Sequence, residues 1–332
     1  MRLRTALGSL AILVACLGSQ AMADDCGPLK QLNSVDLVPG PNRALIPVSL
    51  NGVPKLFLLD TGGDFSQINA AVAQELQLPE RETSMKLLDL SGHASSKYVR
   101  IEKFTVGRLT GPDIDLMESP NPDFGHGTRF VGIFAPDLMG RYDVEIDFGA
   151  HKMNYFSSDH CPGKVVYWPH KALAVQPFTF HKRHIHFIVK LDGKNVMAEI
   201  DTGSQNNSLR AEAAKRIFDL EPESPGNIPL NSQSMTTAFG RVFSSLDFDG
   251  VGVTNPRVII IPDLVGSKDP NNGFKTGSRV QKVDDLDDQP DMLIGMDILR
   301  KLHLYIAFDE NKLYITEASA PAPVQPQTAP AQ

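Results

Sequence analysis

Two copies of the tripeptide Asp-Thr-Gly are the residues of this sequence whose type and spacing point most clearly to chemistry. The first copy is Asp60-Thr61-Gly62, and the second is Asp201-Thr202-Gly203. Each copy follows an apolar segment that is expected to form a strand, so each Asp should stand at a strand end. One such tripeptide can simply begin a turn or cap a helix, because Asp favours both positions. Two copies at equivalent places in a repeated chain are far more specific.

Two carboxyl groups brought within hydrogen-bonding distance can perform acid-base chemistry together. They cannot both ionise easily, so the pair shares one proton. The ionised member can take a proton from a bound water, while the protonated member donates to the oxygen of an attacked carbonyl. This chemistry splits an amide bond with no metal and no cofactor. Gly62 and Gly203 would let the backbone turn closely around the carboxyl groups, and Thr61 and Thr202 could hydrogen-bond across the axis between the copies.

The sequence around the two tripeptides is repeated along the chain. Ile46–Ala73 aligns with Phe187–Ala214 without a gap, at a constant offset of 141. A second match, at an offset of 160, relates Asp137–Met153 to Asp297–Leu313. Such internal similarity indicates a tandem duplication. The two halves span residues 43–160 and 183–317.

Each half predicts the same succession of mostly β elements. An alternating strand reaches Asn51-Gly52 or Asp192-Gly193, and such pairs are the strongest short hairpin signals. A second strand then ends in Asp-Thr-Gly, and a short helix follows over Asn69–Leu78 or Arg210–Leu220. Further strands and a closing hairpin complete each half. We therefore expect a mostly β protein with two small β-barrel lobes related by pseudo-twofold symmetry.

Four segments after residue 23 have no counterpart in the repeat. Residues 24–42 form an N-terminal segment, and residues 161–182 join the two lobes. Residues 267–290 are polar and have no counterpart in the first half, so they are expected to be an inserted loop. The Pro-, Ala- and Gln-rich tail at 318–332 is expected to be disordered.

The repeated motifs resemble those of aspartic proteases of the retropepsin and pepsin type. They read LFLLDTGG at Leu56–Gly63 and VMAEIDTGS at Val196–Ser204, and apolar-Gly pairs follow at Val131-Gly132 and Ile294-Gly295. The closing stretch LIGMDILRKLHLYIAFDENKLYI is similar to the end of bacterial retropepsin-like domains. The resemblance covers nearly all of residues 43–317. It implies the bilobal pepsin-like arrangement within one chain, and hence a monomer.

The resemblance also implies roles for individual residues. Asp60 and Asp201 would form the catalytic dyad of an aspartic endopeptidase acting on a peptide or protein substrate. The residues expected to support the dyad are Thr61, Gly62, Thr202, Gly203 and Ser204. A β-hairpin flap would cover the substrate, and an ordinary surface hairpin is the alternative at each candidate position. The flap candidates are Ser91, Gly92 and His93 in the first half and Phe239 and Gly240 in the second.

Two departures from the family pattern motivate an alternative function. Gly63 stands where a small hydroxyl residue is common, whereas Ser204 keeps it. The first apolar-Gly pair, at Gly132, needs an offset of 163 rather than the 160 found just after it. The alternative is a non-catalytic peptide-binding module that keeps the fold.

Composition excludes several other classes of protein. The 332 residues carry a net charge of −7, which argues against nucleic-acid binding because that needs a basic surface. Three Cys are too few for a disulfide scaffold. His181, His184 and His186 could approach a metal, but no carboxylate or Cys spacing supports a metal site, and none is expected.

The first 23 residues are typical of an export signal. Arg2 and Arg4 precede an apolar run that is too short to span a bilayer, and Ala21-Met22-Ala23 is a cleavage signal. No other run is long enough to span a membrane, so we expect an exported, periplasmic protein. As an alternative, Leu13-Val14-Ala15-Cys16 resembles a lipobox, which would lipidate Cys16 and tether the protein to the envelope as a scaffold.

Two Cys remain once the signal is removed. Cys26 and Cys161 would form a disulfide bond in an oxidising compartment. Such a bond would tie the N-terminal segment to the middle of the chain, and two unpaired thiols are the alternative.

Overall fold

The computed structural model describes residues 26–88, 94–121, 124–125, 127–230, 238–262 and 289–319. Several sequence predictions fall outside these ranges: the signal segment with Cys16, nearly all of the loop at 267–290, and the tail after residue 319. The flap candidates Ser91, Gly92 and His93 also lie outside them. Among the residues within these ranges, no helix is both long and apolar enough to cross a membrane.

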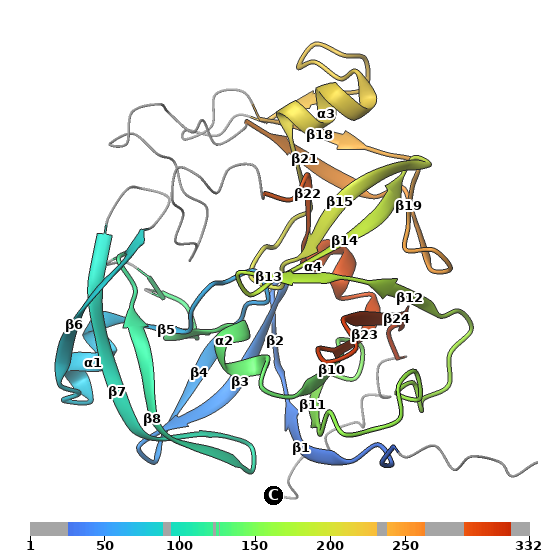
Figure 1. Ribbon diagram of the computed structural model, residues 1–332. Coiled ribbons are helices and arrows are strands. Elements are labelled where there is room, and N and C mark those ends of the chain that lie inside the picture. The colour runs from blue at the N-terminus through green and yellow to red at the C-terminus, as the bar shows by residue number, and fades with distance from the viewer. Residues whose placement is uncertain are drawn as a thin grey trace, which may run out of the picture.

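The described residues form three β-sheets, and the sequence prediction of a mostly β, bilobal architecture is confirmed. The first lobe contains an eight-stranded sheet, at the left of Figure 1. Its strands, in spatial order, are β2 (Val38–Gly40), β3 (Arg43–Leu50), β4 (Val53–Leu59), β9 (Gly132–Phe134), β5 (Gln67–Ile68), β8 (Leu109–Glu118), β7 (Ala94–Val106) and β6 (Glu80–Leu88).

The second lobe contains a ten-stranded sheet, at the top of Figure 1. Its main path is β17 (Ile228–Pro229), β18 (Phe239–Val242), β21 (Arg257–Ile261), β16 (Ser208–Arg210), β22 (Met292–Ile294), β15 (Lys194–Ile200), β14 (His184–Leu191), β19 (Ser245–Asp247) and β20 (Gly252–Thr254). The remaining strand, β13 (Thr179–His181), pairs with β14.

The third sheet joins the lobes, because it takes strands from both halves of the chain. Its order is β1 (Gln31–Asp36), β11 (Lys152–Phe156), β10 (Asp143–Asp147), β23 (Leu302–Ala307), β24 (Lys312–Glu317) and β12 (Ala174–Pro177). The two closing hairpins meet at its centre, where β10 pairs with β23. The helices within the described ranges are α1 (Ala70–Glu75), α2 (Pro136–Met139), α3 (Ala211–Phe218) and α4 (Met296–Leu299).

The repeated hairpins place each Asp-Thr-Gly at the end of a strand. Asn51 and Gly52 have φ values of 51° and 91°, and Asp192 and Gly193 have 46° and 76°. Positive φ at both central residues is the requirement of a tight type I′ turn, which Asn-Gly and Asp-Gly meet at low steric cost. These turns connect β3 to β4 and β14 to β15, and β4 and β15 run directly into the two Asp-Thr-Gly loops.

The core follows from the alternation of residues on these strands. Ile46, Val48 and Leu50 of β3 are buried, as are Val189 and Leu191 of β14. They belong to a single hydrophobic cluster that runs through both lobes and the joining sheet. The lobes therefore share one continuous interior, which fixes the loops at their seam.

The pairing of β4 with β9 corrects one detail of the sequence alignment. Leu59 pairs with Phe134 in the first lobe, and Ile200 pairs with Ile294 in the second. Phe134-Ala135 is therefore the counterpart of Ile294-Gly295, at the same offset of 160 as the rest of that region. The sequence alignment of Gly132 with Gly295 was wrong, because it followed the Gly rather than the strand register.

The N-terminal segment and the linker contain strands that the sequence analysis did not predict. They contribute β1 and β12, which form the two edges of the joining sheet. The predicted bond between Cys26 and Cys161 is present and ties the start of the described chain to the linker. β1 and β12 become strands because they pair with the closing hairpins. Their own residue patterns give little indication that they form strands.

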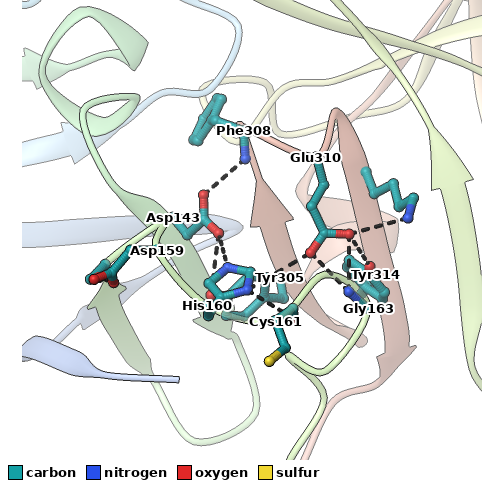
Figure 2. Close-up of polar contacts among 11 residues, drawn as sticks. Asp143, Asp159, His160, Cys161, Gly163, Tyr305, Phe308, Glu310 and Tyr314 are labelled. Carbon is teal, nitrogen blue, oxygen red and sulfur yellow. Dashed lines mark hydrogen bonds and ion pairs between the residues drawn. The ribbon is translucent and has the colours of Figure 1, made fainter. Parts of the chain in front are cut away.

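A network of buried polar side chains lies on the joining sheet beside this bond (Figure 2). His160 Nε2 lies 2.6 Å from a carboxyl oxygen of Asp143, and the hydroxyl of Tyr305 donates to the same oxygen at 3.4 Å. Burial raises the pKa of Asp143 despite these partners. Burial alone would lower the pKa of His160, but its contacts with Asp143 and the Cys161 carbonyl raise it.

The disulfide bond should stabilise the fold. Replacing both Cys26 and Cys161 by Ser should lower the free energy of unfolding by about 2–5 kcal/mol, because the bond closes a long loop and restricts the unfolded chain. Urea unfolding measures this change. The wild type in reductant should match the variant, and reductant should not affect the variant. Equal stability of the oxidised wild type and the variant would contradict the prediction.

The contact between His160 and Asp143 should make stability depend on pH. A raised pKa means that the folded state holds the His160 proton more tightly than the unfolded chain does. This stabilisation is fully present below about pH 6.5 and is lost as pH rises through the folded-state pKa. His160→Gln should therefore lower the free energy of unfolding by about 1–3 kcal/mol at pH 6 and by less at pH 8. Urea unfolding of both proteins at the two pH values measures it, and a pH-independent difference would contradict it.

Candidate active site

Four buried hydrogen bonds lock the two Asp-Thr-Gly loops together. The Thr61 amide donates to the Thr202 hydroxyl at 3.0 Å, and the Thr202 amide donates to the Thr61 hydroxyl at 3.1 Å. The Thr61 hydroxyl donates to the Ile200 carbonyl at 2.8 Å, and the Thr202 hydroxyl donates to the Leu59 carbonyl at 2.7 Å. Both threonines are fully buried. Each loop thus satisfies the polar backbone groups of the other.

Each Asp is held by equivalent backbone contacts. The Asp60 amide donates to the Phe134 carbonyl at 3.0 Å, and the Asp201 amide donates to the Ile294 carbonyl at 2.9 Å. Oδ1 of Asp60 accepts the Gly62 amide at 3.1 Å, and Oδ1 of Asp201 accepts the Gly203 amide at 2.9 Å. These contacts fix the direction in which each carboxyl group points.

The two glycines bring each loop against the opposite carboxyl group. A Cβ atom on Gly62 would lie 2.6 Å from Cγ of Asp201, and a Cβ atom on Gly203 would lie 2.5 Å from Cγ of Asp60. No real side chain fits at such distances, so glycine is required by this close approach. The carboxyl groups of Asp60 and Asp201 therefore both stand at the seam between the lobes.

The two sides of this seam are not identical. Asp60 is buried, whereas Asp201 is partly exposed. Oδ1 of Asp201 also accepts the amide of Ser204 at 3.1 Å, and the Ser204 hydroxyl donates to the Asn206 carbonyl at 2.9 Å. Gly63, the counterpart of Ser204, has no side chain for such a bond.

Ser66 and Asn207 form a supporting pair that the sequence analysis missed. The Ser66 hydroxyl accepts the amide of Ala135, and the Asn207 side chain accepts the amide of Gly295, both at 3.0 Å. The Ser66 hydroxyl also donates to Asp137, whose pKa is raised by burial against the effect of this bond. Their equal offset of 141 was the available signal, because both are small polar residues at matching places.

The flap candidates of the second half lie in a strand. Phe239 and Gly240 belong to β18, and the Phe239 side chain packs into the hydrophobic core. This burial agrees with a structural role, and the flap role of these residues stays a prediction. In the first half, β6 and β7 pair up to Leu88 and Ala94, and these residues flank the candidates that lie outside the described ranges.

A polar cavity of about 520 Å³ lies beside the first loop. It is lined by Phe65 and Ser66 behind the loop, by residues of β6, β7 and β8, and by Arg183 from the second half. The Arg183 guanidinium stacks over the Phe65 ring at 4.5 Å from its centroid. The cavity thus combines an aromatic wall with charged groups.

His184 contacts two carboxyl groups. Its two ring nitrogens lie 2.7 Å from Asp64 and 2.9 Å from Glu199. His186 lies 3.4 Å from the other oxygen of Glu199. Within the ranges that the structure describes, no group of three or more His, Cys, Asp or Glu side chains is arranged to hold a metal ion.

Comparison with known proteins agrees with this geometry. A family model described as aspartyl protease matches residues 46–133 and 187–298, which together make more than half of the chain. The chain belongs to the aspartyl protease family. Both matched segments contain one Asp-Thr-Gly loop, so this aspartyl protease carries the family's motif twice.

A solved structure shows the same fold. The aspartic proteinase from Irpex lacteus aligns with a TM-score of 0.50 at 12% identity, over 87% of this chain and 98% of its own. A retropepsin-like aspartic protease from Rickettsia conorii aligns with a TM-score of 0.30 at 15% identity, over 39% of this chain and 92% of its own. A comparison with curated protein sequences finds no match.

The crossed threonine bonds should be a major source of stability in this aspartyl protease. Thr61→Ala removes the hydroxyl that donates to the Ile200 carbonyl and accepts from the Thr202 amide. Both buried backbone groups then lose this hydrogen-bond partner. The free energy of unfolding should fall by about 2–4 kcal/mol. Thr61→Ser keeps the hydroxyl and is the matched control. Urea unfolding compares them, and an Ala variant as stable as the Ser variant would contradict the prediction.

Proposed function

We propose that this aspartyl protease is an active endopeptidase in which Asp60 and Asp201 form the catalytic dyad. The crossed glycine contacts carry the proposal, because they bring both carboxyl groups to one seam. Carboxyl groups that share a site hold one proton between them, and that proton belongs to the pair rather than to either residue. Such a pair contains both an acid and a base at the same pH.

The hydrolysis then needs only these two side chains and one water molecule. The ionised carboxylate takes a proton from the water as the water oxygen attacks the carbonyl carbon of the scissile amide. The protonated carboxyl gives its proton to the carbonyl oxygen, which forms a tetrahedral diol. The carboxyl group that took the proton from the water then gives a proton to the amide nitrogen, while the other carboxylate takes one from a hydroxyl of the diol. The C–N bond breaks, the products are a carboxylic acid and an amine, and the pair again holds one proton.

The proposed substrate is an extended peptide segment lying between the lobes. The cavity behind Phe65 and Ser66 could receive one of its side chains, and its mixture of aromatic and charged groups favours a polar or amphipathic residue there. The bond between Cys26 and Cys161 supports the further proposal that the protein works in an oxidising compartment such as the periplasm.

A non-catalytic peptide-binding module is the second candidate. Its motives were Gly63 and the irregular first apolar-Gly pair. The strand register removes the second motive, because Phe134-Ala135 aligns regularly with Ile294-Gly295. Gly63 alone now favours this candidate, which predicts saturable peptide binding without turnover.

Replacing either proposed catalytic Asp should abolish peptide cleavage. Asp60→Asn and Asp201→Asn keep the size of the side chain but remove the shared proton and charge, so kcat/KM should fall at least about 1,000-fold. Cleavage of a peptide library, with and without pepstatin, measures this. Asp36→Asn is the matched control, because Asp36 is an exposed residue on the joining sheet. Equal cleavage by all four proteins would end the proposal.

The pH dependence of the same assay tests the shared proton. Activity should be highest at acidic to mildly acidic pH, because raising the pH removes the proton that the pair donates to the carbonyl oxygen. A rate that rises steadily through pH 9 would contradict a pair that shares a proton. Peptide binding without cleavage at any pH would favour the binding module.

A further inference from the structure

We propose that His184 is a positioning residue that holds the two Asp-Thr-Gly loops in register through Asp64 and Glu199. This inference rests on the proposed function, because it concerns the geometry of the same dyad. Asp64 lies four residues after Asp60 in the first lobe, and Glu199 lies two residues before Asp201 in the second. One imidazole ring therefore bridges the segments that carry the two proposed catalytic residues.

The bridge is short and buried. His184 Nε2 lies 2.7 Å from Oδ1 of Asp64, and Nδ1 lies 2.9 Å from Oε1 of Glu199. The Glu199 side chain is completely buried, and those of His184 and Asp64 are about nine-tenths buried. Each ring nitrogen thus faces a carboxyl oxygen of a different residue, and the two contacts together fix the plane of the imidazole ring.

The first lobe is built differently at the equivalent positions. The offset of 141 relates His186 and Glu199 to Leu45 and Leu58, and both pairs face each other across their hairpins. Leu45 and Leu58 pack with Phe130 in a small apolar cluster. The second lobe therefore has a polar pair where its duplicate has an apolar one.

Stability alone does not account for this difference. Burying charged groups costs desolvation free energy, and replacing a buried ionic cluster by packed apolar residues is often neutral or stabilising. What the polar cluster adds is direction, since short hydrogen bonds to carboxyl groups restrict geometry. The counterpart of Asp64 is Gln205, whose amide donates to the Pro41 carbonyl at 3.1 Å. The contact at Gln205 thus goes to a backbone carbonyl, whereas the contact at Asp64 goes to a His ring that also contacts Glu199.

The consequence concerns catalysis more than folding. The threonine bonds join the loops at their centre, and the His184 bridge joins them again outside it. A second connection at a distance from the first restricts the angle between the loops more closely than the threonine bonds do by themselves. A dyad needs this angle, because proton transfer requires the carboxyl groups and the water to lie within hydrogen-bonding distance.

Steady-state cleavage by matched variants tests this role. The Gln side chain of His184→Gln donates only through its NH2 group, so it can replace one of the two contacts, and its carbonyl oxygen repels the other carboxyl group. We therefore expect kcat to fall about 10-fold or more while KM changes less than about 3-fold. The double replacement His186→Leu with Glu199→Leu copies the apolar pair of the first lobe. It should unfold at a temperature no lower than that of the wild type and still show the reduced kcat. Glu199→Gln keeps an acceptor for His184, so it should have a higher kcat than the double variant.

The control is His160→Gln, which disrupts another buried contact between His and Asp without touching the loops. It should reduce stability and leave kcat unchanged at a temperature where the protein is folded. An unchanged kcat in His184→Gln, or full activity in the apolar double variant, would overturn the positioning role while the endopeptidase proposal stands. An equal loss of kcat in His160→Gln would overturn it too. An inactive wild type would instead refute the proposed function itself, and the positioning role with it.

Discussion

The crossed hydrogen bonds of Thr61 and Thr202 are the interaction on which the rest of the structure depends. Buried amide and carbonyl groups must find partners, because leaving them without water or a hydrogen bond is costly. Here the partners of each Asp-Thr-Gly loop come from the opposite lobe. Neither loop is therefore complete alone, and the requirement to satisfy both brings Asp60 and Asp201 to the same seam.

The joining sheet and the continuous core also connect the two lobes and so support this arrangement. The two closing hairpins pair through β10 and β23, and the N-terminal segment and the linker add the outer strands. The bond between Cys26 and Cys161 ties the segment before β1 to the start of the linker after β11, close to the buried contact of His160 with Asp143. Because the shared sheet and the shared core hold the lobes together, short polar contacts at the seam can determine how the two Asp-Thr-Gly loops are oriented.

Much of this organisation was predictable, because a duplication leaves two similar segments in the sequence, and similar segments form equivalent elements. The tight turn at Asn51-Gly52, the strand before Asp60 and its second copy near Asp201 all follow from local residue patterns. The strands β1 and β12 were not predictable, because only pairing with a partner strand makes them regular. The contacts of His184 were missed for a similar reason: Asp64 and Glu199 are distant in sequence, and topology alone brings them to one ring. The alignment of Gly132 failed because residue identity competed with strand register, and register is visible only in the sheet.

We propose that Asp60 and Asp201 act as one acid-base pair, and a high-resolution crystal structure of the protein at mildly acidic pH provides the test of this pairing. The measurement is the shortest distance between their carboxyl oxygens, together with any water bound to both. We expect about 2.5–3.0 Å, the range of a hydrogen bond that shares a proton, with one water contacting both groups. Carboxyl oxygens more than about 5 Å apart, or turned toward separate interiors, would contradict the account.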